Sequence, residues 1–246
     1  MDRLIYTAMS GAKHILEQQA SVSHNLANAV TPGFRAQIDS FRAVPLVGDG
    51  WPTRVFVVDS TVGADFTPGA IQNTGRELDV AVQGKGWIAV QMEDGSEAYT
   101  RNGSLKLSEN GLLQTHNGRN VLGDGGSISI PPDVTIAIGK DGTVSTISTS
   151  GKPGVVNVIG RIKLVNPPEG SVARGDDGFF RAMDGQPVEP DAQVTVVGGA
   201  LEDSNVNVID AMVNMISLGR QFDLHMKMLQ SAENNGSKAS QLLALS

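Results

Sequence analysis

The hydrophobic pattern of this chain changes its period twice along its length. Apolar residues between Ile5 and Leu26 recur at steps of three and four, as on one face of an amphipathic helix. Between residues 76 and 200 the apolar residues alternate instead, which is typical of β-strands, and from Ile209 to Leu229 the helical spacing returns. The chain is therefore predicted to be α+β, with long helices at both ends and a mainly antiparallel β domain between them.

The ends of both helices are marked in the sequence. The N-terminal helix, about 37 Å long at 1.5 Å per residue, should stop at Thr31-Pro32-Gly33, because Pro32 lacks a backbone donor and disfavours helical geometry before it. We expect Ser204 or Asn205 to cap the start of the C-terminal helix, and Gly236 to interrupt it. Two helices of similar length at opposite chain ends favour an antiparallel coiled coil.

Turn signals divide the middle of the chain into short strands. Asn-Gly and Asp-Gly pairs tolerate the positive φ that tight hairpins require, and the first five recur every seven or eight residues. These pairs begin at Asp94, Asn102, Asn110, Asn117, Asp124 and Asp141. We divide the chain into an N-terminal assembly helix (1–31), an extended connector (32–75), a β-rich domain (76–200) and a C-terminal assembly helix (201–246).

The predicted N-terminal helix has an unusual lack of charge near its end. From Gln18 to Phe34 the chain contains no Asp, Glu, Lys or Arg, although a helix face in water normally carries charge. One interpretation is that neighbouring helices surround this stretch, with Asn25 and Asn28 hydrogen-bonding to them, and that the ends are disordered before assembly. The alternative is that both helices pack only on each other or on their own β domain.

Composition excludes several classes of partner and site. The net charge of −7, the pI near 5.0 and the scattered Lys and Arg residues argue against nucleic-acid binding. The chain has no cysteine, which excludes disulfides and thiolate chemistry. It has no run of about 20 apolar residues, so no transmembrane segment is expected. Asp2 offsets Arg3 and polar residues follow early, so no cleaved signal peptide is expected either.

No arrangement of residues indicates a catalytic, cofactor or metal site. Gly84-Lys85-Gly86 lacks the rest of a phosphate loop, and Asp176-Asp177 lies in a typical exposed turn. A catalytic triad needs only to meet in space, so an exported β-rich enzyme or binding module acting on cell wall remains an alternative. The histidines are scattered without metal-ligand spacing. They are His14, His24, His116 and His225.

Motifs in three parts of the chain carry a resemblance. At both ends the sequence closely resembles the signatures of bacterial flagellar rod and hook proteins, and the middle resembles motifs of their β domain. The terminal motifs are Ser23–Asn28, Thr31–Ala36, Leu201–Val208 and Ala211–Val213. The central motifs are Gln83–Trp87, Tyr99–Ser104 and Ile138–Val144. Within this family, Asp2, Thr31–Ala36 and Arg42–Pro45 look most like the proximal-rod type, and a distal rod or hook subunit is the alternative.

The resemblance implies a structural role without a cofactor. The terminal helices would form the inner layer of a hollow rod, packed with helices of neighbouring proximal and distal rod subunits, and the β domain the outer layer. The subunit would pass through the flagellar export apparatus without a cleaved signal peptide and reach the rod within the periplasm. There it would transmit motor torque as part of the drive shaft.

The resemblance and the apolar pattern together suggest a set of assembly-interface residues. Seven of these residues lie in the predicted N-terminal helix, three in the turn after it and six near the other end of the chain. The set comprises Ile5, Met9, Ala12, Leu16, Asn25, Leu26, Asn28, Pro32, Gly33, Phe34, Asn205, Asn207, Ile209, Val213, Ile216 and Phe222.

Overall fold

The computed structural model describes residues 2–45, 55–148 and 156–244. The chain forms two compact units. Unit 1 contains residues 1–29, 37–65 and 206–246, and unit 2 contains residues 30–36 and 66–205. Each unit therefore brings together segments that are far apart in the sequence.

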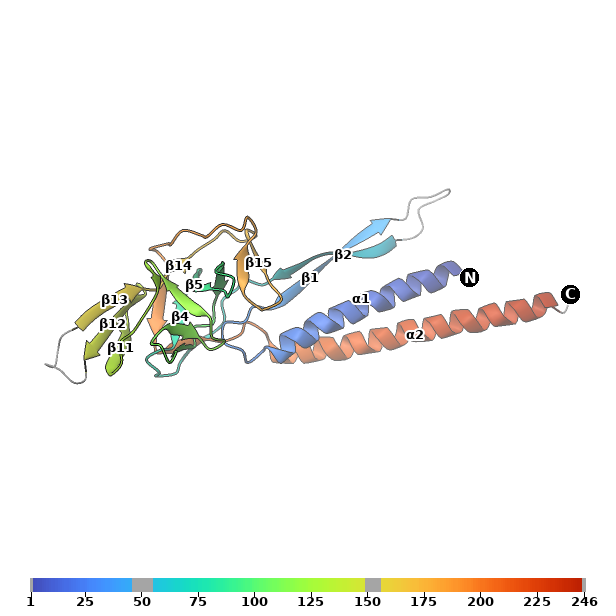
Figure 1. Cartoon of the computed structure of the whole chain (residues 1–246). Coiled ribbons are helices and arrows are strands. Elements are labelled where there is room, and N and C mark those ends of the chain that lie inside the picture. The colour runs from blue at the N-terminus through green and yellow to red at the C-terminus, as the bar shows by residue number, and fades with distance from the viewer. Residues whose placement is uncertain (1, 46–54, 149–155, 245–246) are drawn as a thin grey trace. The chain divides into compact units, whose positions relative to one another are not determined.

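Unit 1 is built on two helices that lie side by side and antiparallel (Figure 1). Helix α1 spans Asp2–Ala27 and helix α2 spans Val208–Ala244, so the predicted pairing of the terminal helices is confirmed. Their lengths differ, however, with 26 residues in α1 and 37 in α2. At 1.5 Å per residue, α2 is about 16 Å the longer.

The structure explains where α1 ends. Its last turn is closed by Asn28, whose backbone N–H and side-chain Nδ2 both donate to the carbonyl oxygen of His24, at 3.2 and 2.9 Å. Pro32 follows, and Gly33 has a φ of 69°, a left-handed conformation that glycine adopts without strain. Helix α1 therefore ends at Ala27, four residues before the predicted stop at Thr31-Pro32-Gly33.

The start of α2 differs from the prediction. The cap is Asn207, whose Oδ1 accepts hydrogen bonds from the backbone N–H groups of Ile209 and Asp210, at 3.0 and 3.4 Å. The expected cap at Ser204 or Asn205 is wrong, because the Asn205 side chain is already bonded to other segments of unit 2. The expected interruption at Gly236 is also wrong, since α2 continues to Ala244.

Two paired strands complete unit 1. Strand β1 (Gln37–Pro45) runs antiparallel to β2 (Val55–Ala64), from Gln37 opposite Ala64 to Pro45 opposite Val55, and the register shifts between Ser40 and Phe41. The ring of Phe41 meets His14 of α1 edge-on, with 5.9 Å between the ring centroids. Both strands lie in the predicted extended connector over 32–75, and their pairing was not predicted.

Unit 2 contains the remaining strands, all of whose described pairings are antiparallel. The largest sheet has the order β15-β16-β6-β5-β9-β8-β7, with β10 on β9 and β14 on β5. A second sheet has the order β11-β12-β13, and β17–β4 and β18–β3 form two pairs.

The bounds of these strands are as follows. The first eight are β3 (Ile71–Asn73), β4 (Val80–Gln83), β5 (Trp87–Gln91), β6 (Glu97–Thr100), β7 (Leu105–Leu107), β8 (Leu113–Thr115), β9 (Asn120–Gly123) and β10 (Gly126–Ser127). The others are β11 (Val134–Ile138), β12 (Thr143–Ser148), β13 (Val156–Arg161), β14 (Leu164–Val165), β15 (Val172–Arg174), β16 (Phe180–Ala182), β17 (Thr195–Gly198) and β18 (Ala200–Glu202).

The core of unit 2 is formed by β-branched and aliphatic side chains. Val80, Ile88, Leu105, Val121 and Ile162 are among its fully buried members. All four residues from Trp87 to Val90 in β5 are buried, so this strand is covered on both faces rather than on one. Many short strands thus share one aliphatic core.

Four of the six predicted turn glycines have the expected left-handed backbone. These are Gly95, Gly111, Gly118 and Gly142, with φ between 77° and 84°. Gly103 is required for another reason, because a Cβ there would lie 1.6 Å from the carbonyl oxygen of Val80.

Candidate assembly interface

Small residues allow the two helices of unit 1 to pack closely. Ala8, Ala12 and Ile15 are buried on α1, as are Ala211 and Leu218 on α2. At another level of the pair, Gly11 faces His225 so closely that a Cβ on Gly11 would lie 2.5 Å from the ring. The inner face of the pair therefore uses only part of the apolar surface that the two helices offer.

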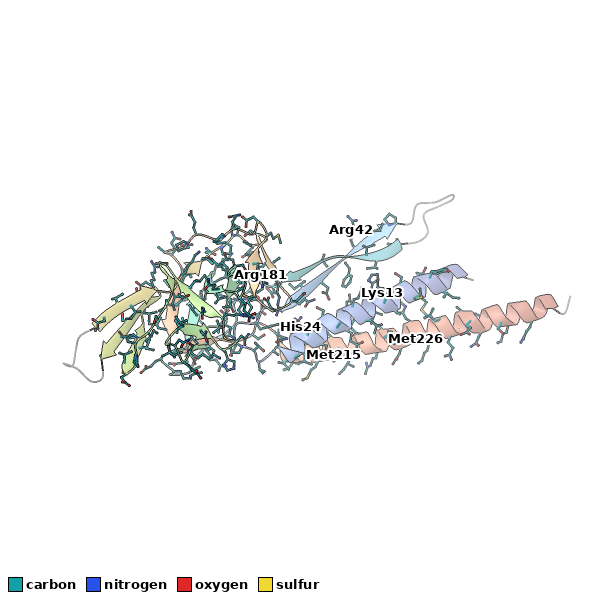
Figure 2. The ribbon with its side chains drawn as sticks, viewed as in Figure 1. Lys13, His24, Arg42, Arg181, Met215 and Met226 are labelled. Carbon is teal, nitrogen blue, oxygen red and sulfur yellow. The ribbon has the colours of Figure 1, made fainter. Side chains whose placement is uncertain are left out.

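A second apolar stripe on α2 remains exposed. Ile209, Val213 and Ile216 have 72%, 59% and 59% of their surface accessible, and Met212 between them is also exposed. Their spacing of three, four and seven residues places them on one face, and Figure 2 shows side chains projecting from α2 on the side away from α1. Exposed apolar patches are typical of surfaces that bind another protein, a ligand or a membrane.

The charge-free stretch of α1 has a counterpart on α2. Between Asp210 and Arg220, α2 carries no Asp, Glu, Lys or Arg. Residues of both stretches line one cavity of about 320 Å³ in unit 1, including Ser21 and Asn25 from α1 and Asn214, Ser217 and Leu218 from α2. The two stretches, 18–27 on α1 and 211–219 on α2, therefore lie at the same level of the pair. We call them the uncharged belt.

The structure separates the predicted apolar residues of α1. Met9 and Leu16 are exposed, at 55% and 50%, whereas Ala12 is buried in the helix pair. Ile5 and Leu26 are half-buried. On α2, Phe222 is half-buried and thus differs from the exposed Ile209, Val213 and Ile216.

The asparagines bond within their own chain. The Asn25 side chain pairs with the backbone of Gln37, accepting from its N–H at 2.7 Å and donating to its carbonyl oxygen at 2.9 Å. Asn28 bonds to His24 and Asn207 caps α2, as described above. These side chains shape the subunit, whereas the sequence interpretation had Asn25 and Asn28 bonding to neighbouring helices.

The remaining predicted residues lie in unit 2. Gly33 donates its N–H to the carbonyl oxygen of Glu202 at 2.7 Å, and Pro32 just before it is half-buried. Phe34 is buried, with the Arg174 guanidinium 4.4 Å from its ring centroid. Asn205 connects several segments of unit 2 through its side chain. The turn after α1 is therefore fixed to the β-rich unit.

Sequence reasoning missed a buried charge cluster. Glu202 lies between two arginines, with Oε1 2.8 Å from Arg35 Nη2 and Oε2 3.0 Å from Arg101 Nε. All three side chains are at most 2% exposed. Burial lowers the pKa of Arg101 to about 10, and the neighbouring Glu202 carboxylate opposes this shift. Arg101 also donates to the carbonyl oxygens of Gly84 and Gly86.

Each member of this cluster comes from a different motif. Arg35 belongs to Thr31–Ala36, Arg101 to Tyr99–Ser104 and Glu202 to Leu201–Val208. The presence of a charged residue inside each motif was the available signal. Which of these charges pair is decided only by the fold, because the three residues are far apart in the sequence.

The sequence was compared with known proteins. A profile described as "Flagellar hook protein FlgE/F/G D1 domain" matches residues 81–146, and one described as "Flagellar basal body rod FlgEFG protein C-terminal" matches residues 197–242. The flagellar basal-body rod protein FlgF of Escherichia coli (strain K12) is 47% identical over 252 aligned residues, which cover all of both chains. This chain belongs to the FlgF family of flagellar basal-body rod proteins.

Other relatives agree with this assignment. The FlgF protein of Salmonella typhimurium (strain LT2) is 45% identical, again over the whole of both chains. The rod protein FlgG of Buchnera aphidicola subsp. Acyrthosiphon pisum is 33% identical, over 90% of this chain and 92% of that protein. The FlgF family is structural, and this member is a rod protein rather than an enzyme.

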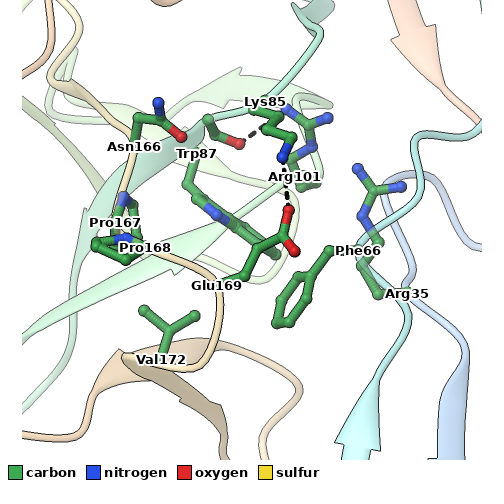
Figure 3. A pocket seen from close by; sticks show the side chains of 11 residues that line it. Arg35, Phe66, Lys85, Trp87, Arg101, Asn166, Pro167, Pro168, Glu169 and Val172 are labelled. Atoms are coloured by element: carbon green, nitrogen blue, oxygen red, sulfur yellow. Dashed lines mark hydrogen bonds and ion pairs between the residues drawn. The ribbon is translucent and has the colours of Figure 1, made fainter.

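A hollow of unit 2 near the charge cluster shows no catalytic arrangement among the described residues. It has a volume of about 280 Å³ and is lined by Trp87, Phe66 and Arg35 (Figure 3). Lys85 and Glu169 form an exposed ion pair of 2.8 Å at this site. Within the described ranges, no three His, Cys, Asp or Glu side chains come together to hold a metal.

Two histidines of this FlgF-family chain make local contacts in unit 1. His14 Nδ1 lies 3.0 Å from Glu17 Oε2 in α1, and His225 packs over Gly11.

Neither helix, over the part of it that the structure describes, is long and apolar enough to cross a membrane.

Proposed function

We propose that this chain is a subunit of the proximal part of the flagellar rod and transmits motor torque along the shaft across the periplasm. The observation that carries the proposal is the uncharged belt of unit 1 together with the exposed stripe Ile209, Met212, Val213 and Ile216 on α2. In the isolated chain this apolar surface faces water. Packing against helices of neighbouring rod subunits would bury it.

The energetics favour assembly through many small contacts. Fully burying one aliphatic side chain contributes about 1.5–3 kcal/mol, and the stripe offers several of them per subunit. Because the same contact repeats from subunit to subunit, such a lattice would be stiff even though each contact is modest. Asn25, Asn28 and Asn207 support this function indirectly, by fixing the ends of the helices that carry the surface.

A single charge in the stripe tests the proposal. Ile216→Asp places a carboxylate on an exposed position, so the purified chain should fold normally but fail to form rods, and cells should not swim. The matched control is Ser231→Asp, also exposed on α2 but outside the belt and one turn from Lys227. Circular dichroism checks folding, and swimming with imaging of the motors checks assembly. Motile Ile216→Asp cells with complete rods would contradict the proposal.

A deletion distinguishes positions along the axis. Removing the coding region should leave motors with a truncated rod if the chain is proximal. A complete rod that lacks only the outer structure would instead place the chain in the distal rod or the hook. Normal motors and swimming would contradict a role in the rod altogether.

Passage through the flagellar export apparatus without a cleaved signal belongs to the same proposal. Mass spectrometry of the assembled subunit checks its N-terminus.

A further inference from the structure

The chain passes between its two units at four points. These lie between residues 29 and 30, 36 and 37, 65 and 66, and 205 and 206. On the unit 2 side they belong to only three segments: residues 30–36, the segment that begins at Phe66 and the segment that ends at Asn205. Contacts among these three segments decide whether the connections of unit 2 move separately or together.

Asn205 joins all three segments through one residue. Its side-chain Oδ1 accepts a hydrogen bond from Ala36 N at 2.7 Å, and its Nδ2 donates to the carbonyl oxygen of Thr67 at 3.1 Å. Its own backbone N–H donates to the carbonyl oxygen of Phe34 at 3.4 Å. Ala36, Thr67 and Asn205 each lie within two residues of a crossing point.

Glu202 joins the same three segments a few residues further into unit 2. Its carbonyl oxygen accepts from Gly33 N at 2.7 Å, and its Oε1 accepts from Gly69 N at 2.9 Å. The same Oε1 pairs with Arg35, whose Nη1 donates to the carbonyl oxygen of Thr67. The segments are thus connected twice, once by a neutral amide and once by a charged group.

The buried charge makes partial opening unfavourable. Removing one partner from a buried ion pair leaves an uncompensated charge, which costs more than the intact pair contributes. If the segment 30–36 separated alone, Glu202 would lose one of its two arginines, Arg35, while it remained buried. Separation of all three segments together exposes the charges of Arg35 and Glu202 to water instead.

We propose that residues 30–36, 66–70 and 202–205 form a collar that opens only as one cooperative unit. The three segments through which the chain leaves unit 2 are then bonded to one another inside unit 2, close to the crossing points. The mechanical consequence rests on the proposed function: in a rod subunit under torque, force arriving through any one connection is shared by three segments. A single segment is not peeled away on its own.

Hydrogen exchange in the purified full-length chain tests the collar. Asn205→Ala removes the acceptor of the Ala36 amide, but the Gly33 and Gly69 amides are bonded to Glu202 and not to Asn205. A cooperative collar predicts that all three amides exchange faster, by about tenfold or more, because each opening exposes them together. Residue-resolved NMR of the exchange measures the three rates separately.

The test has a matched control variant, Asn207→Ala, and two outcomes that would refute the collar. Asn207→Ala removes the cap of α2, whose hydrogen bonds to Ile209 and Asp210 lie within unit 1, and should leave the Gly33, Ala36 and Gly69 rates unchanged. If Asn205→Ala accelerates only Ala36, the segments open independently and the collar is refuted. Equal acceleration of all three amides by Asn207→Ala would refute it as well. Because the exchange is measured on the isolated chain, this result is separate from the Ile216→Asp test of rod assembly.

Discussion

Substitution of Gly33 tests most directly how closely the turn after α1 packs on the backbone of Arg101 and Asn102. Its φ of 69° is left-handed, and a Cβ there would lie 2.3 Å from the backbone carbon of Arg101 and 2.4 Å from Asn102 N. Gly33→Ala therefore combines a conformational penalty with a collision between two backbones. Gly75 has nearly the same φ, 70°, but a Cβ there would meet nothing within 4 Å, so Gly75→Ala isolates the conformational penalty.

The two substitutions should differ clearly in magnitude. The left-handed conformation costs a residue with a Cβ about 1–2 kcal/mol, which both variants share. At Gly33 the neighbouring backbone must also withdraw by about 1 Å, and forced repacking of this kind costs a further 1–3 kcal/mol, approximately. Against a typical stability of about 5–15 kcal/mol, Gly33→Ala should remove about 2–5 kcal/mol of the free energy of unfolding and Gly75→Ala about 1–2 kcal/mol.

Urea denaturation followed by the fluorescence of Trp87 measures both losses. Trp87 is buried in unit 2, and a Trp51→Phe background removes the other tryptophan of the chain. Equal losses for Gly33→Ala and Gly75→Ala, within about 0.5 kcal/mol, would refute the close approach of the two backbones. Such a result would also weaken the conclusion that the turn after α1 is fixed to unit 2.

Two further predictions concern pH and helix packing. Burial raises the pKa of Tyr99 to about 12, so stability should be intact below pH 10 and fall by about 2–3 kcal/mol in total as the pH rises from 10 through 12. Absorbance at the phenolate band in alkali checks this pKa, and Tyr99→Phe should lose the transition near pH 12 together with the decline in stability that accompanies it. Gly219→Ala, in open space on α2, should raise the free energy of unfolding by about 0.5–1 kcal/mol. Gly11→Ala should not raise the free energy of unfolding, because the ring of His225 would have to move away from the added Cβ. Thermal denaturation compares the two variants, and an equal rise in stability for Gly11→Ala and Gly219→Ala would contradict the packing of Gly11 against His225.

Local signals were sufficient for the two terminal helices and for four of the six turns. The apolar spacing from Ile5 to Leu26 and the stop at Thr31-Pro32-Gly33 predict α1, because both depend on neighbouring residues. The Asn-Gly and Asp-Gly pairs at Gly95, Gly111, Gly118 and Gly142 predict turns for the same reason. The errors arose where two local signals compete, as at the start of α2, where Asn205 and Asn207 are both good capping residues.

The candidate interface was predictable only in part. The exposed Ile209, Val213 and Ile216 follow from helical spacing, but the same spacing also selects Ala12, which α1 and α2 bury between them. Spacing identifies an apolar face and not the protein surface that covers it. The pairing of β1 with β2 was not predicted, because the sequence around and between the two strands is irregular and indicates a connector rather than a hairpin.

Sequence alone determined the α+β class, the terminal helices, the lack of charge from Gln18 to Phe34 and the family resemblance, since these are properties of neighbouring residues or of composition. Only the tertiary structure decided that Arg35, Arg101 and Glu202 meet, that Asn25 and Asn205 bond within the subunit, and that one uncharged belt crosses both helices. The physical reason is that burial and pairing depend on distances between segments that are far apart along the chain. A one-dimensional pattern contains no measure of those distances.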